Sequence, residues 1–307
     1  MNLKLSLVKL FCLIIINIFL FGGCTSESGS EQPTVLATTS IIGDILRNIL
    51  PEQIAVDQLM GPGVDPHMYK ASQGDVQNLT RADVIVYNGL HLEGKMSEIL
   101  ERLSRTKNVL TFASALDKKD LRSLDSGDVT DPHIWFDLEL SMKCIDGLSR
   151  ELTSIFPDHS SYISEATTHY ISELAQAHDR CVAQIDQIPV EERILITSHD
   201  AFGYFGSAYA FQVKGLQGIS TMSESGLKDV TNMVNYIIDH KVKAVFVENS
   251  VPQKALRSVI EGCRRKGHEV KIGGELFSDA LGAERTPEGT YLGMIQYNVS
   301  TIINALQ

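Results

Sequence analysis

The 307-residue sequence predicts an α/β fold in which two (β/α)4-type lobes, each built on a parallel sheet, are joined by one long rigid helix. Two observations predict the lobes. Short apolar runs rich in β-branched residues alternate with helical patterns, and this alternation occurs twice along the chain. A third observation predicts the connection, because one uninterrupted helical stripe separates the two halves.

The strands and helices alternate in the same order in both halves. In the first half the expected strands are 34–39, 54–60, 83–88 and 108–113, and the helices include 41–50 and 95–103. In the second half the expected strands are 193–198, 211–215, 243–248 and 269–273, with helices at 227–240 and 253–266. Continuous apolar runs of this kind are typical of strands covered by helices on both faces.

The linking helix is expected over 158–188, between Pro157 and Pro189, which punctuate its ends. Its apolar residues recur at steps of three and four, and they are Ile163, Ala166, Tyr170, Leu174, Ala177, Cys181, Ile185 and Ile188. At 1.5 Å per residue such a helix is about 45 Å long. A helix of this length between two lobes would resist wide hinge opening. The alternative is that it is one helix of the second domain.

The N-terminal residues predict export and a lipid anchor. Lys4 and Lys9 precede an apolar stretch at 10–21 that is too short to span a bilayer and fits a signal peptide at 1–23. Small residues directly before Cys24 resemble a bacterial lipobox, so Cys24 is the expected lipidation site. A polar tether at 24–33, a first lobe at 34–157, the linking helix and a second lobe at 189–307 would follow. An ordinary signal peptide with a chance cysteine is the alternative.

Composition excludes several functions. The chain is 43% hydrophobic and 21% charged with a formal net charge of −11, which is typical of a globular protein and unsuited to binding nucleic acid. Cys144, Cys181 and Cys263 are too widely spaced for a cysteine zinc site, and a buried thiol is expected for each. We find no G-x-x-x-x-G-K-[ST] element, so the chain is not its own ATPase.

Three histidines and one aspartate are the candidate metal ligands. His67 and His133 each end an Asp-Pro-His tripeptide, His199 follows the first strand of the second half, and Asp279 follows the last strand. Ligands in α/β sheets bind beyond the carboxyl ends of strands, so each lobe offers two donors at the expected edge. Three imidazoles and a carboxylate suit a first-row transition metal.

Other residues compete with this set or could support it. His91 partly shares the position after a strand, and His240 and His268 are further candidates, whereas the histidines at 159, 169 and 178 are expected at the surface or in packing. Ligand histidines usually donate their second N–H to a carboxylate or carbonyl. The acids near enough in sequence are Asp65, Asp131, Asp137, Asp200 and Glu248, and the sequence does not choose among them.

Six ordered motifs then resemble those of the zinc/manganese solute-binding proteins of bacterial ABC transporters, the cluster A-I or cluster 9 group. They lie at 61–67, 88–93, 131–137, 198–205, 215–218 and 274–279. The resemblance implies two α/β lobes with metal bound between them. It further implies an extracytoplasmic, membrane-anchored lipoprotein of the periplasm or cell surface, acting as a monomer with a membrane permease and a separate cytoplasmic ATPase.

The resemblance places the ligands on His67, His133, His199 and Asp279 but does not select the metal. Many manganese members carry glutamate where His199 stands, and zinc-specific members often carry a His-rich loop before the second ligand, where 117–130 here has no histidine. Zn²⁺, Mn²⁺ and Fe²⁺ are therefore all candidates for the transported ion. The alternatives are a metal-dependent hydrolase and a surface adhesin with a structural metal, and we expect no enzyme activity.

Overall fold

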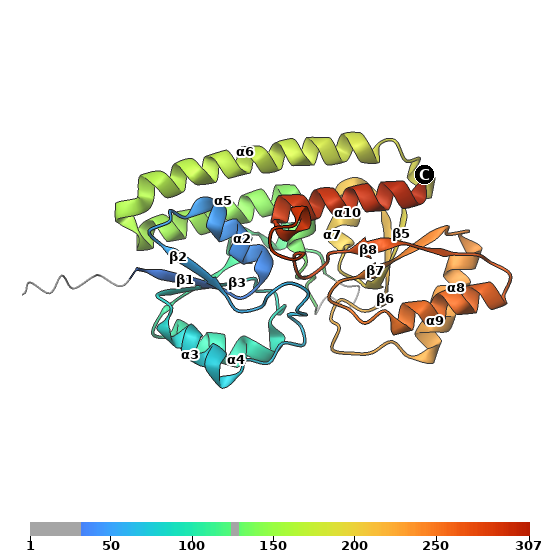
Figure 1. Ribbon diagram of the computed structural model, residues 1–307, viewed down its shortest axis with the longest axis horizontal. Helices are drawn as coiled ribbons and strands as arrows, with labels where there is room; N and C mark the ends of the chain where they lie inside the picture. Colours follow the sequence, from blue (N-terminus) through green and yellow to red (C-terminus); the bar gives the residue numbers. More distant parts are fainter. Residues whose placement is uncertain (1–31, 124–128) are drawn as a thin grey trace, which may run out of the picture. The chain divides into compact units, whose positions relative to one another are not determined.

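A four-stranded parallel sheet forms the first half of the protein in the computed structural model, which describes residues 32–123 and 129–307 (Figure 1). Its strands are β1 (Thr34–Ala37), β2 (Ala55–Gln58), β3 (Val84–Tyr87) and β4 (Asn108–Thr111), in the order β2-β1-β3-β4. Val35 is in register with Val56 on one side and with Val84 on the other. The four expected strands are present, each shorter than the apolar run that predicted it.

Helices cover both faces of this sheet. Apolar side chains point to both faces, and each face packs against its own helices to form a core. Val35 and Val84 belong to the core that includes α2 (Ser40–Ile49), whereas Leu36 and Ile85 belong to the core that includes α3 (Gln73–Arg81) and α4 (Ser97–Ser104). These helices lie on opposite sides of the sheet (Figure 1). Successive side chains of a strand point to opposite faces, so one apolar run serves both cores. α3 begins with a capping box made by Ser72 and Asp75.

The second half repeats the arrangement with two parallel strand pairs. β5 (Ile194–His199) pairs with β6 (Gln212–Gln217), and β7 (Ala244–Glu248) pairs with β8 (Lys271–Leu276), while β5 also lies against β7. α8 (Leu227–Asp239) and α9 (Lys254–Arg265) pack on the core that holds Ile196 and Val245. α7 (Gly203–Tyr209) and α10 (Tyr291–Leu306) join the larger core instead.

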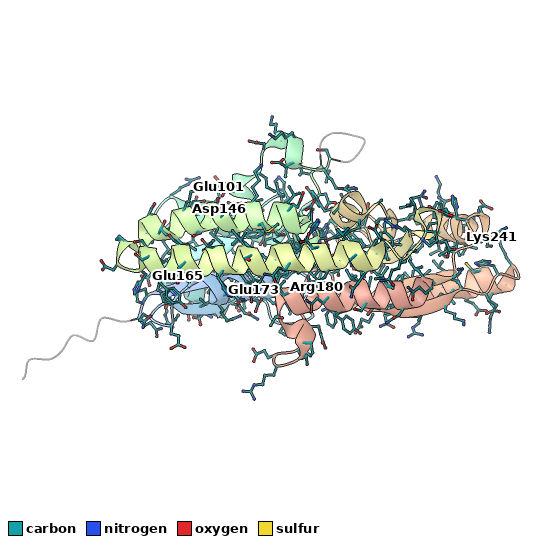
Figure 2. All side chains as sticks on the ribbon, turned by 90° about the horizontal axis from the view of Figure 1, so that it is seen from above. Glu101, Asp146, Glu165, Glu173, Arg180 and Lys241 are labelled. Carbon is teal, nitrogen blue, oxygen red and sulfur yellow. The ribbon has the colours of Figure 1, made fainter. Side chains whose placement is uncertain are left out.

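The long helix α6 (Ser160–Ile185) packs on α5 (Leu138–Ile155), α10 and α2. It lies over α5 and α10 in Figure 1 and runs between them when seen from above in Figure 2. A short 3₁₀ turn at Pro157–His159 precedes it, and with 26 residues it is about 39 Å long. Glu165, Glu173 and Arg180 lie on its exposed face (Figure 2).

The buried stripe of α6 differs from the expectation at one position. Thr167 is buried and its hydroxyl donates to Ser149 Oγ at 2.9 Å, whereas Ala166 is only half-buried. Both positions give steps of three and four between Ile163 and Tyr170, so the periodicity alone did not separate Thr167 from Ala166.

One continuous core connects the two halves. It joins residues of β1 and α2 to residues of α7 and α10, and the buried stripe of α6 belongs to the same cluster. Residues Pro33–Gln307 correspondingly form one compact unit. The expected signal peptide and Cys24 lie outside the described residues. Within 32–123 and 129–307, no helix combines the length and apolarity needed to cross a membrane, and Cys144, Cys181 and Cys263 are buried free thiols.

Candidate metal centre

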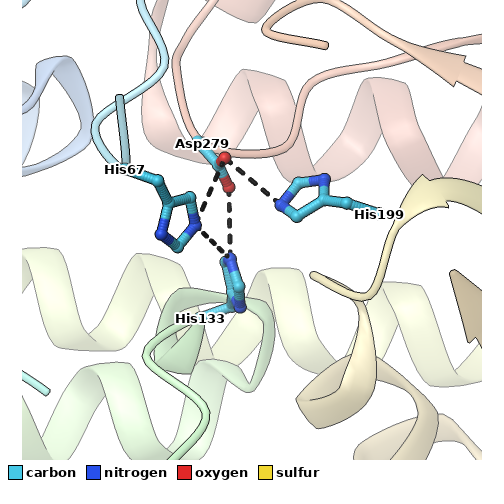
Figure 3. Close-up of side chains that lie close together, drawn as sticks. All are labelled: His67, His133, His199 and Asp279. Carbon is cyan, nitrogen blue, oxygen red and sulfur yellow. Dashed lines mark hydrogen bonds and ion pairs between the residues drawn. The ribbon is translucent and has the colours of Figure 1, made fainter. Parts of the chain in front are cut away.

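Four predicted donors meet in one place, two from each half of the chain (Figure 3). His67 lies in the loop after β2, and His133 lies between β4 and α5. His199 is the last residue of β5, and Asp279 follows β8. The carboxyl ends of the strands therefore face one another across the centre, as the general rule for α/β sheets predicts.

The donor atoms are close together and shielded from water. One ligand atom from each residue lies within 4.8 Å of all the others. The His67 and His133 Nε2 atoms are 3.3 Å apart, and Asp279 Oδ1 is 3.4 Å from His133 Nε2. Asp279 Oδ2 is 3.3 Å from His199 Nε2 and 3.8 Å from His67 Nε2. The four residues are at most 2% exposed.

The two Asp-Pro-His tripeptides fix their histidines by the same local bond. Asp65 Oδ1 accepts the His67 backbone N–H at 2.8 Å, and Asp131 Oδ1 accepts the His133 backbone N–H at 3.0 Å. Asp131 also lies 2.7 Å from His133 Nδ1. Because a carboxylate only accepts, Nδ1 carries the proton and the Nε2 lone pair of His133 faces the centre.

His199 is oriented by Glu248 at the end of the neighbouring strand β7. Glu248 Oε2 lies 2.5 Å from His199 Nδ1, and Oε1 accepts the His199 backbone N–H at 2.9 Å. Gly215 on β6 permits this packing, since a Cβ there would come within 2.4 Å of the backbone at His199 and Asp200. Gly215, the first residue of the motif at 215–218, thus has a steric cause.

The Asp279 carboxylate is buried without a well-formed hydrogen bond. Neither of its carboxylate oxygens accepts a hydrogen bond of good geometry from any residue that the structure describes, although the residue is 1% exposed. Its neighbours are the Nε2 atoms already named, which are themselves ligand atoms. Buried polar atoms are almost always satisfied, so a carboxylate left this way among three imidazoles fits a bound cation.

Burial and neighbouring charges shift the pKa values of the cluster in opposite directions. Burial lowers the pKa of His67 to about 4. Burial also lowers the pKa of His199, but the Glu248 and Asp279 carboxylates outweigh it and hold that pKa well above its ordinary value. Burial raises the pKa of Asp279, but the nearby imidazoles hold it below its ordinary value. Asp279 is therefore ionised, and an ionised carboxylate beside three imidazoles is a donor set that suits a divalent cation.

The competing histidines do not join the centre. His91 is exposed, the His240 ring stacks on Tyr236, and His268 Nε2 lies 2.9 Å from the Val242 carbonyl oxygen. In and next to α6, His169 is exposed and lies near Glu173, while His178 Nδ1 is 3.3 Å from the Tyr209 hydroxyl and His159 lies in the preceding turn. None of these residues belongs to the cluster.

Sequence patterns missed the long-range contacts that align the donors. Trp135 Nε1 donates to the Ser278 carbonyl at 2.9 Å, which joins the segment after His133 to the residue before Asp279. In the motif at 88–93, Asn88 Nδ2 donates to the Pro132 carbonyl at 3.0 Å, directly before His133. The only available signal was the position of these residues inside the motifs.

Comparisons with known proteins agree with this geometry. The family model for ZnuA, the zinc-uptake complex component A, periplasmic, matches residues 35–305. The manganese-binding lipoprotein MntA of Bacillus subtilis is 43% identical over 293 residues, 94% of this chain and 96% of that protein. The zinc-binding protein TroA of Treponema pallidum is 38% identical over 301 residues, 96% of this chain and 97% of that protein.

A solved structure shows the same fold. The periplasmic zinc-binding protein TroA from Treponema pallidum superposes with a TM-score of 0.88 at 40% identity, over 90% of this chain and 99% of that chain. A periplasmic metal-binding protein from Candidatus Liberibacter asiaticus, at 24% identity and a TM-score of 0.80, shares the fold. With a family model that spans nearly the whole described chain and relatives well above 30% identity, this chain belongs to the ZnuA family of periplasmic zinc-uptake components.

Proposed function

We propose that this protein captures one divalent transition-metal ion through His67, His133, His199 and Asp279 and delivers it to an ABC permease for import. The observation that carries the proposal is the convergence of four buried donors from both halves, in which neither Asp279 oxygen accepts a well-formed hydrogen bond from a described residue. The ion is cargo, so the chain needs no catalytic group. The relatives reported above are named as metal-binding proteins, which favours this function over a hydrolase or an adhesin.

The proposal includes partners and a location. The protein would act as a monomer in the periplasm or at the cell surface, held to the membrane by lipid on Cys24. A separate ATPase would drive the permease, because the sequence has no P-loop of its own. The lipoprotein relative MntA supports the anchor. The lobes would comprise 34–157 and 189–307, with 158–188 between them.

The donor set permits both metals for which the relatives are named. If Asp279 binds through one oxygen, three imidazoles complete a tetrahedron that suits Zn²⁺. If it binds through both oxygens, the five-coordinate site suits Mn²⁺ or Fe²⁺ better. MntA is named for manganese and TroA for zinc, so the physiological ion is a question for measurement.

The test is a metal titration of the purified chain without its first 31 residues. Trp135 is the only tryptophan, and its ring centroid lies 5.3 Å from that of His133, so its fluorescence should report binding. We expect Zn²⁺ and Mn²⁺ each to bind with a stoichiometry of one. Elemental analysis of protein from the native host would identify the ion. Absence of binding, or several equivalent sites, would contradict the proposal.

A further inference from the structure

One carboxylate connects the His67 loop to the opposite half of the protein. Asp65 Oδ1 accepts the backbone N–H groups of His67 at 2.8 Å and Met68 at 3.3 Å. Its other oxygen, Oδ2, accepts the Thr221 hydroxyl at 2.6 Å. Thr221 belongs to the segment between β6 and α8 in the second half. A single acid therefore holds a metal-donor loop and a segment more than 150 positions away.

This contact lies between the buried centre and the solvent. Asp65 and Thr221 are half-buried, whereas their neighbours Met68 and Met222 are 45% and 56% exposed. The hydrogen bond consequently joins two segments whose neighbouring side chains reach the solvent.

Two other cross-half hydrogen bonds, both made by Trp135, have a different setting. The Trp135 Nε1 bond to Ser278 is buried, and so is the bond from the Tyr291 hydroxyl to the Trp135 carbonyl. Those bonds belong to the shared core, and breaking them would expose apolar surface. The bond between Asp65 and Thr221 can break without disturbing that core, because both partners are half-buried loop residues outside it.

We propose that Thr221 is a positioning residue that latches the His67 loop over the bound ion and so sets the rate at which the ion escapes. The inference rests on the proposed function. Thr221 itself donates nothing to the metal, and acts only through Asp65. A hydrogen bond to a charged acceptor stabilises more than a neutral one, so its loss from the closed form should speed release about tenfold or more.

The experiment compares three variants. Thr221→Val keeps the shape of the side chain and removes the hydroxyl, while Thr221→Ser keeps the hydroxyl. Ser207→Ala is the matched control, because it removes another cross-half hydroxyl, the acceptor of the Arg122 Nη1 bond at 3.0 Å. Each protein is loaded with Zn²⁺ and, separately, with Mn²⁺. It is then mixed with excess chelator while Trp135 fluorescence is followed.

We expect about tenfold faster release from Thr221→Val, wild-type release from Thr221→Ser and Ser207→Ala, and unchanged melting temperatures for the metal-free proteins. If Thr221→Val folds poorly, Thr221→Ala tests the same loss. Release at the wild-type rate from the valine variant would overturn the latch, as would equal acceleration in the serine variant. If the wild-type protein binds neither ion, the proposed function itself fails, which is a distinct result.

Discussion

Replacing Glu248 by glutamine isolates the contribution of a residue that never touches the metal. Glutamine has nearly the same size, and its Oε1 can still accept the His199 backbone N–H that Glu248 accepts at 2.9 Å. The change removes the negative charge that lies 2.5 Å from His199 Nδ1. Both side chains are fully buried, so water cannot screen the loss.

The expected magnitude follows from this geometry. Loss of a carboxylate that orients a ligand histidine typically lowers metal affinity 10- to 100-fold. At about 1.4 kcal/mol per factor of ten, this corresponds to about 1.4–2.8 kcal/mol of binding free energy. The effect should depend on pH, because the same carboxylate also raises the pKa of His199 and so favours the proton that competes with the metal.

The assay is competition with a chelator of known affinity, followed by Trp135 fluorescence at pH 8 and at pH 6. In the variant, protons compete less strongly with the metal for His199, and at pH 6 this partly offsets the loss of affinity. The loss should therefore be larger at pH 8. Glu192→Gln is the matched control, because Glu192 forms an exposed ion pair with Lys243 at 2.9 Å in the same half. Unchanged affinity at pH 8, or an equal loss in the control, would refute the reasoning.

Further predictions test the ligands, the proton and the interface. His67→Ala and His133→Ala should each lower metal affinity more than about 100-fold, which exceeds the loss expected for a residue that only orients a ligand. His169→Ala should leave the affinity unchanged. Equal affinities of the three variants in a metal titration would reject the ligand assignment. Metal affinity should fall as the pH falls from 7 to 5, by about tenfold per pH unit for each proton that the metal displaces. The reason is that the raised pKa of His199 keeps a proton on this residue until the metal replaces it. Undiminished binding at pH 5 in a buffered titration would contradict this prediction. Trp135→Phe should lower the free energy of unfolding of the metal-free protein by about 1–3 kcal/mol, because the buried Ser278 carbonyl loses its donor. Urea denaturation followed by circular dichroism measures this. A wild-type midpoint would show that the hydrogen bond contributes little.

The sequence carried enough information to group the four donors. Parallel strands place their carboxyl ends at one edge, so His199 at the end of β5 and Asp279 after β8 could be assigned to the same region before any contact was known. The repeated Asp-Pro-His tripeptide added a local reason for fixed histidines, and the structure shows that reason as matching bonds to the two backbone N–H groups.

The choice of outer partners could not be predicted, because it depends on residues far away in the chain. Asp65 and Asp131 occupy identical tripeptides, yet only Asp131 contacts the ring of its own histidine. Asp65 instead accepts the hydroxyl of Thr221, 156 positions later. The local sequence predicts the same contacts for Asp65 and Asp131. Their different partners follow from the packing of the two halves.

The shared core also limits how the protein can release an ion. Wide separation of the halves would expose the stripe of α6 that packs between α2 and α10, and each fully buried Leu or Ile stabilises the packed state by about 1.5–3 kcal/mol. Breaking the hydrogen bond between Asp65 and Thr221 costs about as much as exposing one such residue. Since wide opening would expose many of them, movement of the His67 loop requires far less free energy. Release should therefore depend on the loops around the centre, with α6 remaining in place.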